Sequence, residues 1–499
     1  MWGMKGCFLL QRKYAWIAHA LAVNLKKNHG ITEFCGYVQS RKAERFLRAQ
    51  KDIKYTDLLI DEDVHARYKD EPFDLAYIKK IEREYGEPNL WKFITVDRTI
   101  MMRIPPNEYA FRPNPLYSHE EMLRLLQVKF KAIISFLEKE KPDFLVMSAV
   151  ASMGTRILYH VAKKIGVRTI TIDPSRVKNL VSLSDHYLNM TGVQTIFDQL
   201  QQKKHHSNHL DEARSFLQEF RKSHISYAPL LANFNPLKRF AFLLPWNAIK
   251  SLWWLIRLCG QHLRGMHNND YAEETPWGII KTRIQRKIRG FIGYKDLYEV
   301  PNFKEDFAYF QLHFEPELAI MLYAPSWPDQ IEVVRHIARS LPTHFKLYVR
   351  EHRAMVNYRT RAFYKELKKI SNVKLISPSV DLFTLLPAAK LVTVITSTAG
   401  WEATLLGKPV ITFGDVFFNA ISSVKKCTNV ETLPALVQSQ LHNKTNNDQE
   451  LIHYLAAIFE ESVPVDYHHL WEEESDFEKI KENSGIKNLA GLLAKKLEK

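Results

Sequence analysis

The sequence predicts an α/β protein with two units, each a parallel sheet covered by helices. In the first part of the chain, apolar and β-branched runs alternate with amphipathic helical segments, which is the pattern of strands joined by helical crossovers. The alternation is lost over residues 200–304, which are helical, aromatic and basic, and it resumes at residue 305. Because 499 residues exceed what one hydrophobic core usually supports, we place the units at 1–199 and 305–460, with 200–304 as an insertion or linker and 461–499 as a helical tail.

The first unit opens with a strand, a helix and a second strand. The helical segment ends at Gly30 with lysines in its last turn, as helices commonly end. In order, the expected elements are strand GCFLLQ, helix YAWIAHALAVNLKKNHG, strand ITEFCGYV, helix HEEMLRLLQVKFKAIISFLEKEK, strand DFLVMSA, helix SMGTRILYHVAKKIG and strand VRTITI. This order predicts neighbouring parallel strands.

The second unit repeats the pattern with shorter helices. In order, the expected elements are strands AYFQLHF and LAIMLYA, helix DQIEVVRHIARSLP, strand FKLYVRE, helix RTRAFYKELKKIS, strand VKLIS, helix DLFTLLPAA, strand LVTVIT, helix WEATLL and strand PVITFG. The helices VETLPALVQSQLHN and ELIHYLAAIFEESV follow.

Residues 240–260, FAFLLPWNAIKSLWWLIRLCG, form the most apolar part of the insertion, but Asn247, Lys250 and Arg257 interrupt the run. Residues 201–300 hold 16 Lys or Arg against 8 Asp or Glu, and the chain as a whole carries +15. Tryptophan and leucine beside positive charge suit a helix lying in a membrane interface. A helix packed between the two units and a true membrane span are the alternatives.

The remaining composition excludes several classes of site. The four cysteines are scattered without a CxxC pair, which indicates a reducing compartment and no cysteine metal site. The apolar stretch near the N-terminus is interrupted by Gln11, Arg12 and Lys13, so we expect no export signal and a cytoplasmic protein. The basic charge favours anionic partners, yet no RNP, helix-turn-helix or zinc-finger pattern is present, so we expect no nucleic-acid partner.

The segment LVTVITSTAGWEATLLGKPVITFGD, residues 391–415, carries the clearest functional pattern. A buried strand runs into a Ser-Thr-Ala-Gly turn and then a helix, and in open parallel sheets ligands bind beyond the carboxyl ends of the strands. A helix N-terminus with a serine or threonine cap attracts phosphate, and glycine allows close backbone approach. Glu402 in the first turn either accepts hydrogen bonds from a ribose or only caps its own helix.

These residues resemble a family. STAGWEATLLGKPVITFGDVFF, together with FQLHFEPELAIMLYAPSWPDQIEVVRHIARSLPTHFKLYVREH, is similar to the capsular polysaccharide biosynthesis proteins, relatives of the capsule Kdo transferases. The resemblance covers residues 305–420 well, and EYGEPNLWKFITVDR and KPDFLVMSAVASMGTRILYHVAKKIG more loosely. It implies a GT-B glycosyltransferase fold, with two Rossmann-like domains facing a cleft, the nucleotide sugar on the C-terminal domain and the acceptor on the N-terminal one.

The resemblance also implies a nucleotide-binding set. Ser397, Thr398 and Gly400 would line the donor phosphate, and Glu402 would hold the nucleotide. Glu351 and His352 occupy the place of a motif that usually ends in His-Pro, but Arg353 stands where the proline is expected. His352 keeps its capacity to bind phosphate or cytosine.

Glycosyl transfer requires a group that accepts the acceptor's proton. The HFEPE stretch offers Glu315 and His313, with Glu315 also able to orient the histidine. Asp97 and Asp173 end strand-like runs of the first unit, where helix or turn capping is the alternative role. We expect no metal and no cofactor other than the donor substrate.

The sequence thus predicts a glycosyltransferase that moves a sugar from a CMP- or UDP-linked donor to a capsular polysaccharide or its lipid-linked (glycolipid) precursor, at the cytoplasmic face of the inner membrane. Two alternatives remain: a nucleotide-sugar epimerase, which needs no acceptor, and a non-catalytic capsule assembly or export protein that keeps the fold.

Overall fold

The computed structural model describes residues 3–101, 115–224, 245–263, 276–315, 318–442 and 447–498. The chain divides into two compact units, each with its own sheet. Unit 1 comprises Met1–Ile100, Tyr117–Arg214 and Ile452–Lys499, and unit 2 comprises Met101–Leu116 and Ser215–Leu451. The predicted α/β class with two Rossmann-like units is confirmed.

Unit 1 contains a seven-stranded sheet in the order β13-β6-β5-β4-β1-β2-β3. The strands are β1 Lys5–Leu10, β2 Glu33–Val38, β3 Leu58–Ile60, β4 Phe144–Met147, β5 Arg168–Pro174, β6 Leu180–Ser184 and β13 Ser462–Pro464. Strands β1 to β5 run parallel, whereas β6 and β13 pair antiparallel at one edge. Strands β1, β2, β4 and β5 were predicted, and β3, β6 and β13 were not.

The helices of unit 1 cover this sheet. They are α1 Tyr14–His29, α2 Arg41–Ala49, α3 Asp61–Ala66, α4 Leu75–Tyr85, α5 Trp91–Thr95, α6 Arg98–Met101, α7 His119–Glu140, α8 Met153–Lys164, α9 Thr191–Gln201, α20 Phe477–Glu482 and α21 Ser484–Glu498. Helices α10 Leu210–Ser223 and α19 Asp448–Glu461 run across the boundaries between the units.

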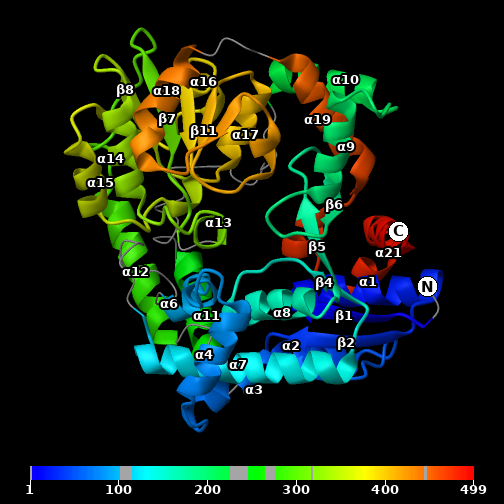
Figure 1. Ribbon diagram of the computed structural model, residues 1–499. Coiled ribbons are helices and arrows are strands. Elements are labelled where there is room, and N and C mark those ends of the chain that lie inside the picture. The colour runs from blue at the N-terminus through cyan, green and yellow to red at the C-terminus, as the bar shows by residue number, and fades with distance from the viewer. Residues whose placement is uncertain are drawn as a thin grey trace. The chain divides into compact units, whose positions relative to one another are not determined.

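The C-terminal residues complete unit 1 instead of forming a separate tail. Helix α21 lies beside α1 (Figure 1), and Leu489 and Leu493 are fully buried in the core that α1 shares with the sheet. This contact explains why α1 is buried along most of its length. The division between the units therefore differs from the predicted boundaries at residues 305–460 and 461–499, because residues from 452 onward pack on the N-terminal unit.

Unit 2 contains a six-stranded, fully parallel sheet in the order β12-β11-β10-β7-β8-β9. Its strands are β7 Phe307–Gln311, β8 Lys346–Arg350, β9 Val373–Ile376, β10 Leu391–Val394, β11 Val410–Thr412 and β12 Val424–Lys426. The run LAIMLYA, expected as a strand, forms a short helix at Leu318–Met321 and a turn.

The helices of unit 2 are α11 Pro245–Leu263, α12 Pro276–Ile292, α13 Leu318–Met321, α14 Gln330–Ser340, α15 Arg361–Lys368, α16 Leu382–Leu385, α17 Thr398–Leu405 and α18 Leu433–His442. Of the apolar segment at 240–260, residues 240–244 lie outside the described part of the chain, and the rest belongs to α11. No helix among the described residues is long and apolar enough to cross a bilayer.

Candidate functional site

The predicted nucleotide-binding residues of unit 2 lie at one edge of its sheet. Strands β7, β8 and β10 are neighbours and parallel, so their carboxyl ends lie together. His313 follows β7, Glu351 and His352 follow β8, and Ser397 follows β10. This edge is where ligands bind in open parallel sheets.

The turn after β10 begins helix α17 as predicted. Ser397 is the N-cap, and its Oγ accepts a hydrogen bond from the N–H of Ala399 at 3.2 Å. Ser397 and Thr398 are half-buried, so both reach the surface. The first N–H groups of a helix have no partner within it, and the N–H of Thr398 is one of these. The turn can therefore offer a hydroxyl and a backbone donor to an anion.

Glycine was expected at position 400 so that the backbone can approach a ligand closely, but the structure gives another reason, the packing of α17 on β10. A Cβ at this position would lie 2.6 Å from Cγ2 of Val394 and 3.1 Å from the ring of Phe418. Its N–H already donates to the carbonyl of Ser397 at 3.0 Å. Gly400 thus permits α17 to pack closely on β10, and its N–H is not available to a ligand in this conformation.

Glu402 was predicted in the first turn of its helix, but it lies after the first turn of α17, with 3% of its surface exposed. Its charge acts on Tyr309 of β7, whose pKa burial raises to about 12 while Arg350 opposes the rise and Glu402 adds to it. The predicted contact of Glu402 with a ribose stays a prediction.

Arg359, which was not predicted as a site residue, is the centre of a buried network with Glu351, Glu315 and His313. Its guanidinium donates to Glu351 Oε1 at 2.5 Å, to Glu315 Oε2 at 3.1 Å and to the carbonyl of His313 at 2.7 Å. Arg359 is 1% exposed. Burial alone lowers the pKa of Arg359, but the Glu351 and Glu315 carboxylates outweigh it and raise that pKa. Arginine is usually exposed, so no local pattern marks this one as buried.

The two carboxylates of this network are fixed by protein groups. Glu351 also accepts from the N–H of His352 at 2.6 Å and from the hydroxyl of Tyr364 at 2.6 Å. Burial raises the pKa of Glu315 although Arg359 opposes the rise, and Glu315 is 3% exposed. Both groups are placed to orient their neighbours, and a base role for Glu315 stays a prediction.

His313 connects the network to the turn after β10. Its Nε2 accepts a hydrogen bond from the N–H of Thr396 at 2.9 Å, so its proton resides on Nδ1. Burial lowers the pKa of His313 to about 3, and the nearby His352 and the guanidinium of Arg359 add to this effect. The imidazole is therefore neutral at physiological pH and holds the turn against the end of β7.

His352 is the predicted site residue of this network that reaches the surface. It is half-buried, and its Nδ1 accepts from the N–H of Ala354 at 3.3 Å, which places the proton on Nε2. Burial lowers its pKa. Arg353, which replaces the expected proline, is half-buried, and its Nε donates to the carbonyl of Pro378 at 3.3 Å. The edge thus presents a neutral imidazole N–H and a guanidinium.

Arg350 is buried and connects the strand ends at this edge to the loop after β9. Its guanidinium donates to the carbonyls of Pro378 and Val380 at 3.0 Å each, and to Gln311 Oε1 at 3.1 Å. These bonds hold the loop after β9 against β7 and β8. Arg350 therefore positions the loop that Arg353 also contacts.

The two predicted residues of unit 1 differ in environment. Asp97 follows helix α5 and not the expected strand. It is 1% exposed and accepts from the N–H groups of Thr99 and Met153, each at 3.0 Å, so it links α6 to the start of α8. Asp173, on β5, is half-buried and accepts from Thr171 Oγ1 at 3.3 Å. Burial raises the pKa of Asp173 to about 7, against the opposing effects of Thr171 and Arg176. A carboxylate with that pKa suits proton transfer near neutral pH.

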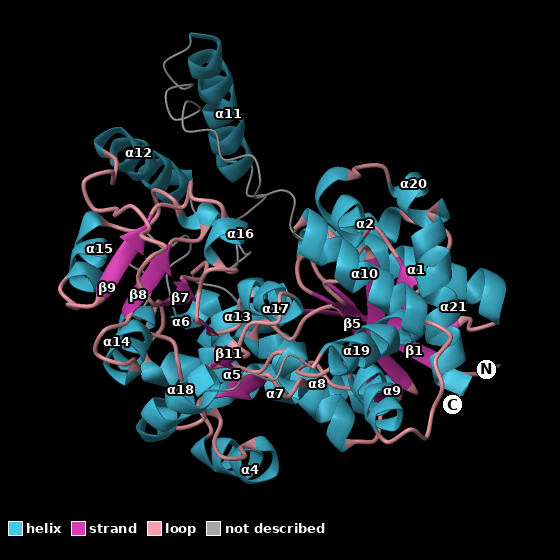
Figure 2. Ribbon diagram, turned by 90° about the horizontal axis from the view of Figure 1, so that it is seen from above, coloured by secondary structure: helices cyan, strands magenta, loops and turns pink. Residues whose placement is uncertain are grey.

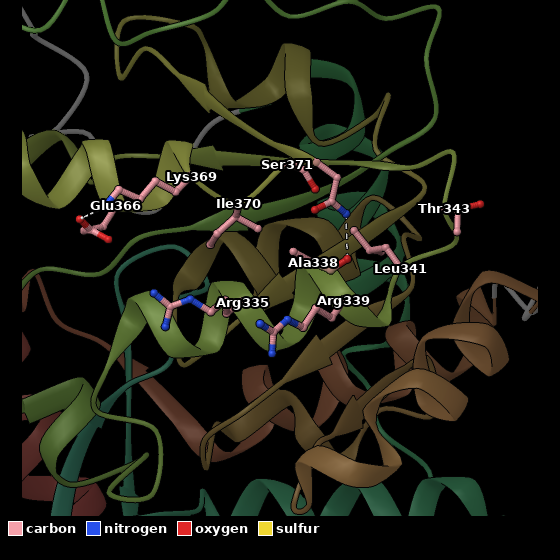
Figure 3. Close-up of a pocket in the computed structure, with 10 residues that line it drawn as sticks. Arg335, Ala338, Arg339, Leu341, Thr343, Glu366, Lys369, Ile370 and Ser371 are labelled. Atoms are coloured by element: carbon pink, nitrogen blue, oxygen red, sulfur yellow. Dashed lines mark hydrogen bonds and ion pairs between the residues drawn. The ribbon is translucent and has the colours of Figure 1, made fainter.

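A cavity of about 500 Å³ lies at the opposite edge of the unit 2 sheet, before β8 and β9. Figure 3 shows Arg335 and Arg339 on α14 at this cavity, with Lys369 paired to Glu366 at 2.6 Å. It contains none of the predicted site residues. Among the described residues, no cluster of three or more His, Cys, Asp or Glu side chains is arranged to hold a metal ion.

Comparison with known proteins gives one family match. Residues 267–430 match the family described as "Capsule polysaccharide biosynthesis protein". No curated protein matches the chain.

Several solved structures are similar at low identity. KpsC, a beta Kdo 2,7 transferase of Thermosulfurimonas dismutans, is 11% identical over 74% of this chain and 90% of its own, with a TM-score of 0.37. The UDP-GlcNAc 2-epimerase of Neisseria meningitidis is 14% identical over 99% and 100%, with a TM-score of 0.26. The calicheamicin glycosyltransferase CalG4 is 9% identical over 92% and 95%, with a TM-score of 0.28.

These TM-scores are too low to support a fold assignment. The assignment therefore depends on the two sheets described above. The matched family segment includes β7, β8 and β10, and with them Glu351, His352 and the turn that starts α17. The resemblance to the capsule polysaccharide biosynthesis family that the sequence predicts is confirmed over residues 267–430.

Proposed function

We propose that the protein is a glycosyltransferase that moves a sugar from a CMP- or UDP-linked donor to a capsular polysaccharide or its lipid-linked precursor. One observation carries the proposal: within the segment that matches the capsule family, Ser397, Thr398 and His352 reach the surface together at the carboxyl edge of a parallel sheet.

The chemistry of this edge suits a donor phosphate. A departing nucleotide carries negative charge on its phosphate, and catalysis requires dipoles or cations fixed where that charge develops. The start of α17 supplies the N–H of Thr398 and two hydroxyls, while His352 Nε2–H and Arg353 supply further donors. Beneath them, His313 and Arg359 fix the two segments that carry these groups.

The acceptor side requires a base, and Asp173 is the strongest of the four predicted candidates. The oxygens of Asp97 are engaged by Thr99 and Met153, Glu315 is ion-paired to Arg359, and His313 uses Nε2 to hold Thr396. Asp173 combines partial exposure with a pKa of about 7. We assign it the role of accepting the proton of the acceptor hydroxyl.

Product analysis tests this function. The purified chain is incubated with CMP- and UDP-sugars, with and without capsular oligosaccharide or glycolipid acceptors. A transferase releases the nucleotide in proportion to glycosylated acceptor. Sugar isomerisation without an acceptor would identify an epimerase, and donor binding without turnover under any condition would identify a non-catalytic assembly protein.

The proposal includes a cytoplasmic location with membrane contact through residues 240–260. Support comes from the described part of this segment, α11, whose Trp253 and Ile256 are 71% and 59% exposed.

A further inference from the structure

Helix α12 carries a stripe of exposed apolar side chains outside the candidate site. Trp277, Ile284, Ile288 and Phe291 are 72%, 51%, 54% and 73% exposed. Their spacings of seven, four and three residues place them on one face of the helix. Large apolar side chains gathered on one exposed face mark an interaction surface.

The opposite face of α12 packs on the rest of unit 2, which shows that the apolar stripe faces away from it. The guanidinium of Arg286 lies 3.8 Å from the ring centroid of Tyr358, and Arg289 donates to the carbonyl of Tyr358. A Cβ on Gly290 would lie 3.1 Å from the amide of Asn357. Because this face packs on the segment after β8, the apolar stripe points away from it.

Helix α11 repeats the arrangement. Ile249, Leu252, Trp253 and Ile256 are between 51% and 71% exposed, and their spacing also places them on one face. Trp254, on another face, stacks with Arg283 of α12 at 3.5 Å. In Figure 2, α11 lies farther from the strands of unit 2 than α12 does.

The charge of the two helices identifies the partner. Neither helix contains an aspartate or a glutamate. The lysines and arginines are Lys250, Arg257, Lys281, Arg283, Arg286, Lys287 and Arg289. A second copy of this surface would be repelled by like charge, and a nucleic acid would leave the tryptophans and isoleucines in water. An anionic lipid headgroup layer above acyl chains satisfies both the charges and the apolar stripes.

We propose that α11 and α12 together form a docking surface for an anionic lipid bilayer, with Trp277 and Phe291 inserted at the headgroup level and Lys281 and Lys287 against lipid phosphates. This surface includes a second helix beyond the 240–260 segment. It deepens the membrane contact proposed for residues 240–260 but requires no glycosyltransferase activity, so failure of its test would leave the proposed sugar transfer standing.

Vesicle co-sedimentation of the full chain tests the proposal. We expect binding to phosphatidylglycerol–phosphatidylcholine vesicles and much weaker binding to phosphatidylcholine alone. The double variants Trp277→Ser/Phe291→Ser and Lys281→Glu/Lys287→Glu should each bind about tenfold more weakly or worse. The first loses apolar area buried in the interface, and the second loses two lysines that each contribute about 1 kcal/mol near an anionic surface. Trp91→Ser is the matched control, since Trp91 is 46% exposed on unit 1, and it should bind like the wild type.

Three results would overturn the proposal. They are absence of wild-type binding to the anionic vesicles, equal binding to neutral vesicles, and unchanged binding by both double variants while each remains folded by circular dichroism. Sedimentation velocity separates a further outcome: a wild-type dimer that the Trp277→Ser/Phe291→Ser variant converts to a monomer would show that a second copy covers the stripe.

Discussion

At the scale of single residues, the candidate site depends on a buried arginine that holds two carboxylates. Arg359 joins Glu351 after β8 to Glu315 and His313 after β7. The groups that reach the surface, His352 and Ser397, lie next to residues that this network fixes. The network therefore acts on a bound donor through the position of its neighbours.

Replacing Arg359 should lower the free energy of unfolding more than replacing a surface arginine does. Arg359→Met leaves two buried carboxylates without their cation, so we expect the free energy of unfolding to fall by about 3–5 kcal/mol. Arg335→Met, which removes an exposed pair with Glu332, should cost about 0–1 kcal/mol. Chemical denaturation at several pH values measures both. The loss in Arg359→Met should shrink on acidification, as the carboxylates become protonated, and a pH-independent loss would contradict the charge argument.

Asp173 makes a prediction that separates catalysis from stability. Its folded pKa of about 7 lies above the reference value of 3.8. The charged form is thus disfavoured in the folded protein, and the stability that protonated Asp173 provides at low pH is lost as pH rises from 3.8 through about 7. The free energy of unfolding of Asp173→Asn should therefore rise relative to that of the wild type by about 1.4 kcal/mol per pH unit across that window.

As the proposed base, Asp173 must be deprotonated, so wild-type turnover should rise as pH passes through about 7. Asp173→Asn should lower kcat about 10²–10⁴-fold and abolish this acidic limb, although it folds well. Measuring kcat against pH for both proteins checks this. Thr171→Val serves as the control, because it removes hydrogen bonds to Asp173 and to the carbonyl of Ser184 but keeps the carboxylate. Retention of the acidic limb in Asp173→Asn would assign it to another group.

At the scale of elements, the sequence predicts local structure better than assembly. The strands β7 to β11 and the cap at Ser397 follow from apolar runs and turn residues that act locally. The pairing of β13 with β6 was missed, because β13 is three residues long and Ser462 pairs with Ser182, which is 280 residues away in the chain. Arg359 was missed because its partners are assembled from two strand ends.

Gly400 tests the packing of α17 on β10. Gly400→Ala should lower the unfolding free energy by about 1–3 kcal/mol, because the new methyl group collides with Val394 and Phe418. Gly260→Ala in α11 is the matched control: nothing lies within 4 Å of its added Cβ, and alanine favours a helix by about 1 kcal/mol. Thermal unfolding compares the two variants. Equal stability of Gly400→Ala and wild type would show that α17 has room to shift.

At the scale of the whole molecule, the N-terminal unit is completed by the last residues of the chain. Residues from 452 onward supply the edge strand β13 and the helices that cover α1. Local patterns show that these residues are helical but not which sheet they cover, since any apolar face can pack on several others. The sequence therefore could not assign them to unit 1.

Removing α21 should unfold unit 1. Without residues 484–498, α1 would lose the helix that packs along it and shares its apolar core, and a domain that loses a covering helix exposes more apolar surface than its stability allows. Limited proteolysis should then cleave the truncated chain within residues 1–200, where the full chain resists. Leu492→Ala, at a position only partly buried against the same core, is the milder control. Resistance of the truncated chain to proteolysis would show that unit 1 stays folded without α21.

The central claim, that the edge formed by β7, β8 and β10 binds a nucleotide-sugar donor, is tested most directly by calorimetric titration. CMP- and UDP-sugars are titrated into the wild type, Thr398→Ala, His352→Ala and the control Lys369→Ala at the opposite edge of the sheet. We predict that one donor class binds the wild type and Lys369→Ala equally, and that each of the other variants binds about tenfold more weakly, the loss of one hydrogen bond to a charged group. Wild-type affinity in both Thr398→Ala and His352→Ala would contradict the account.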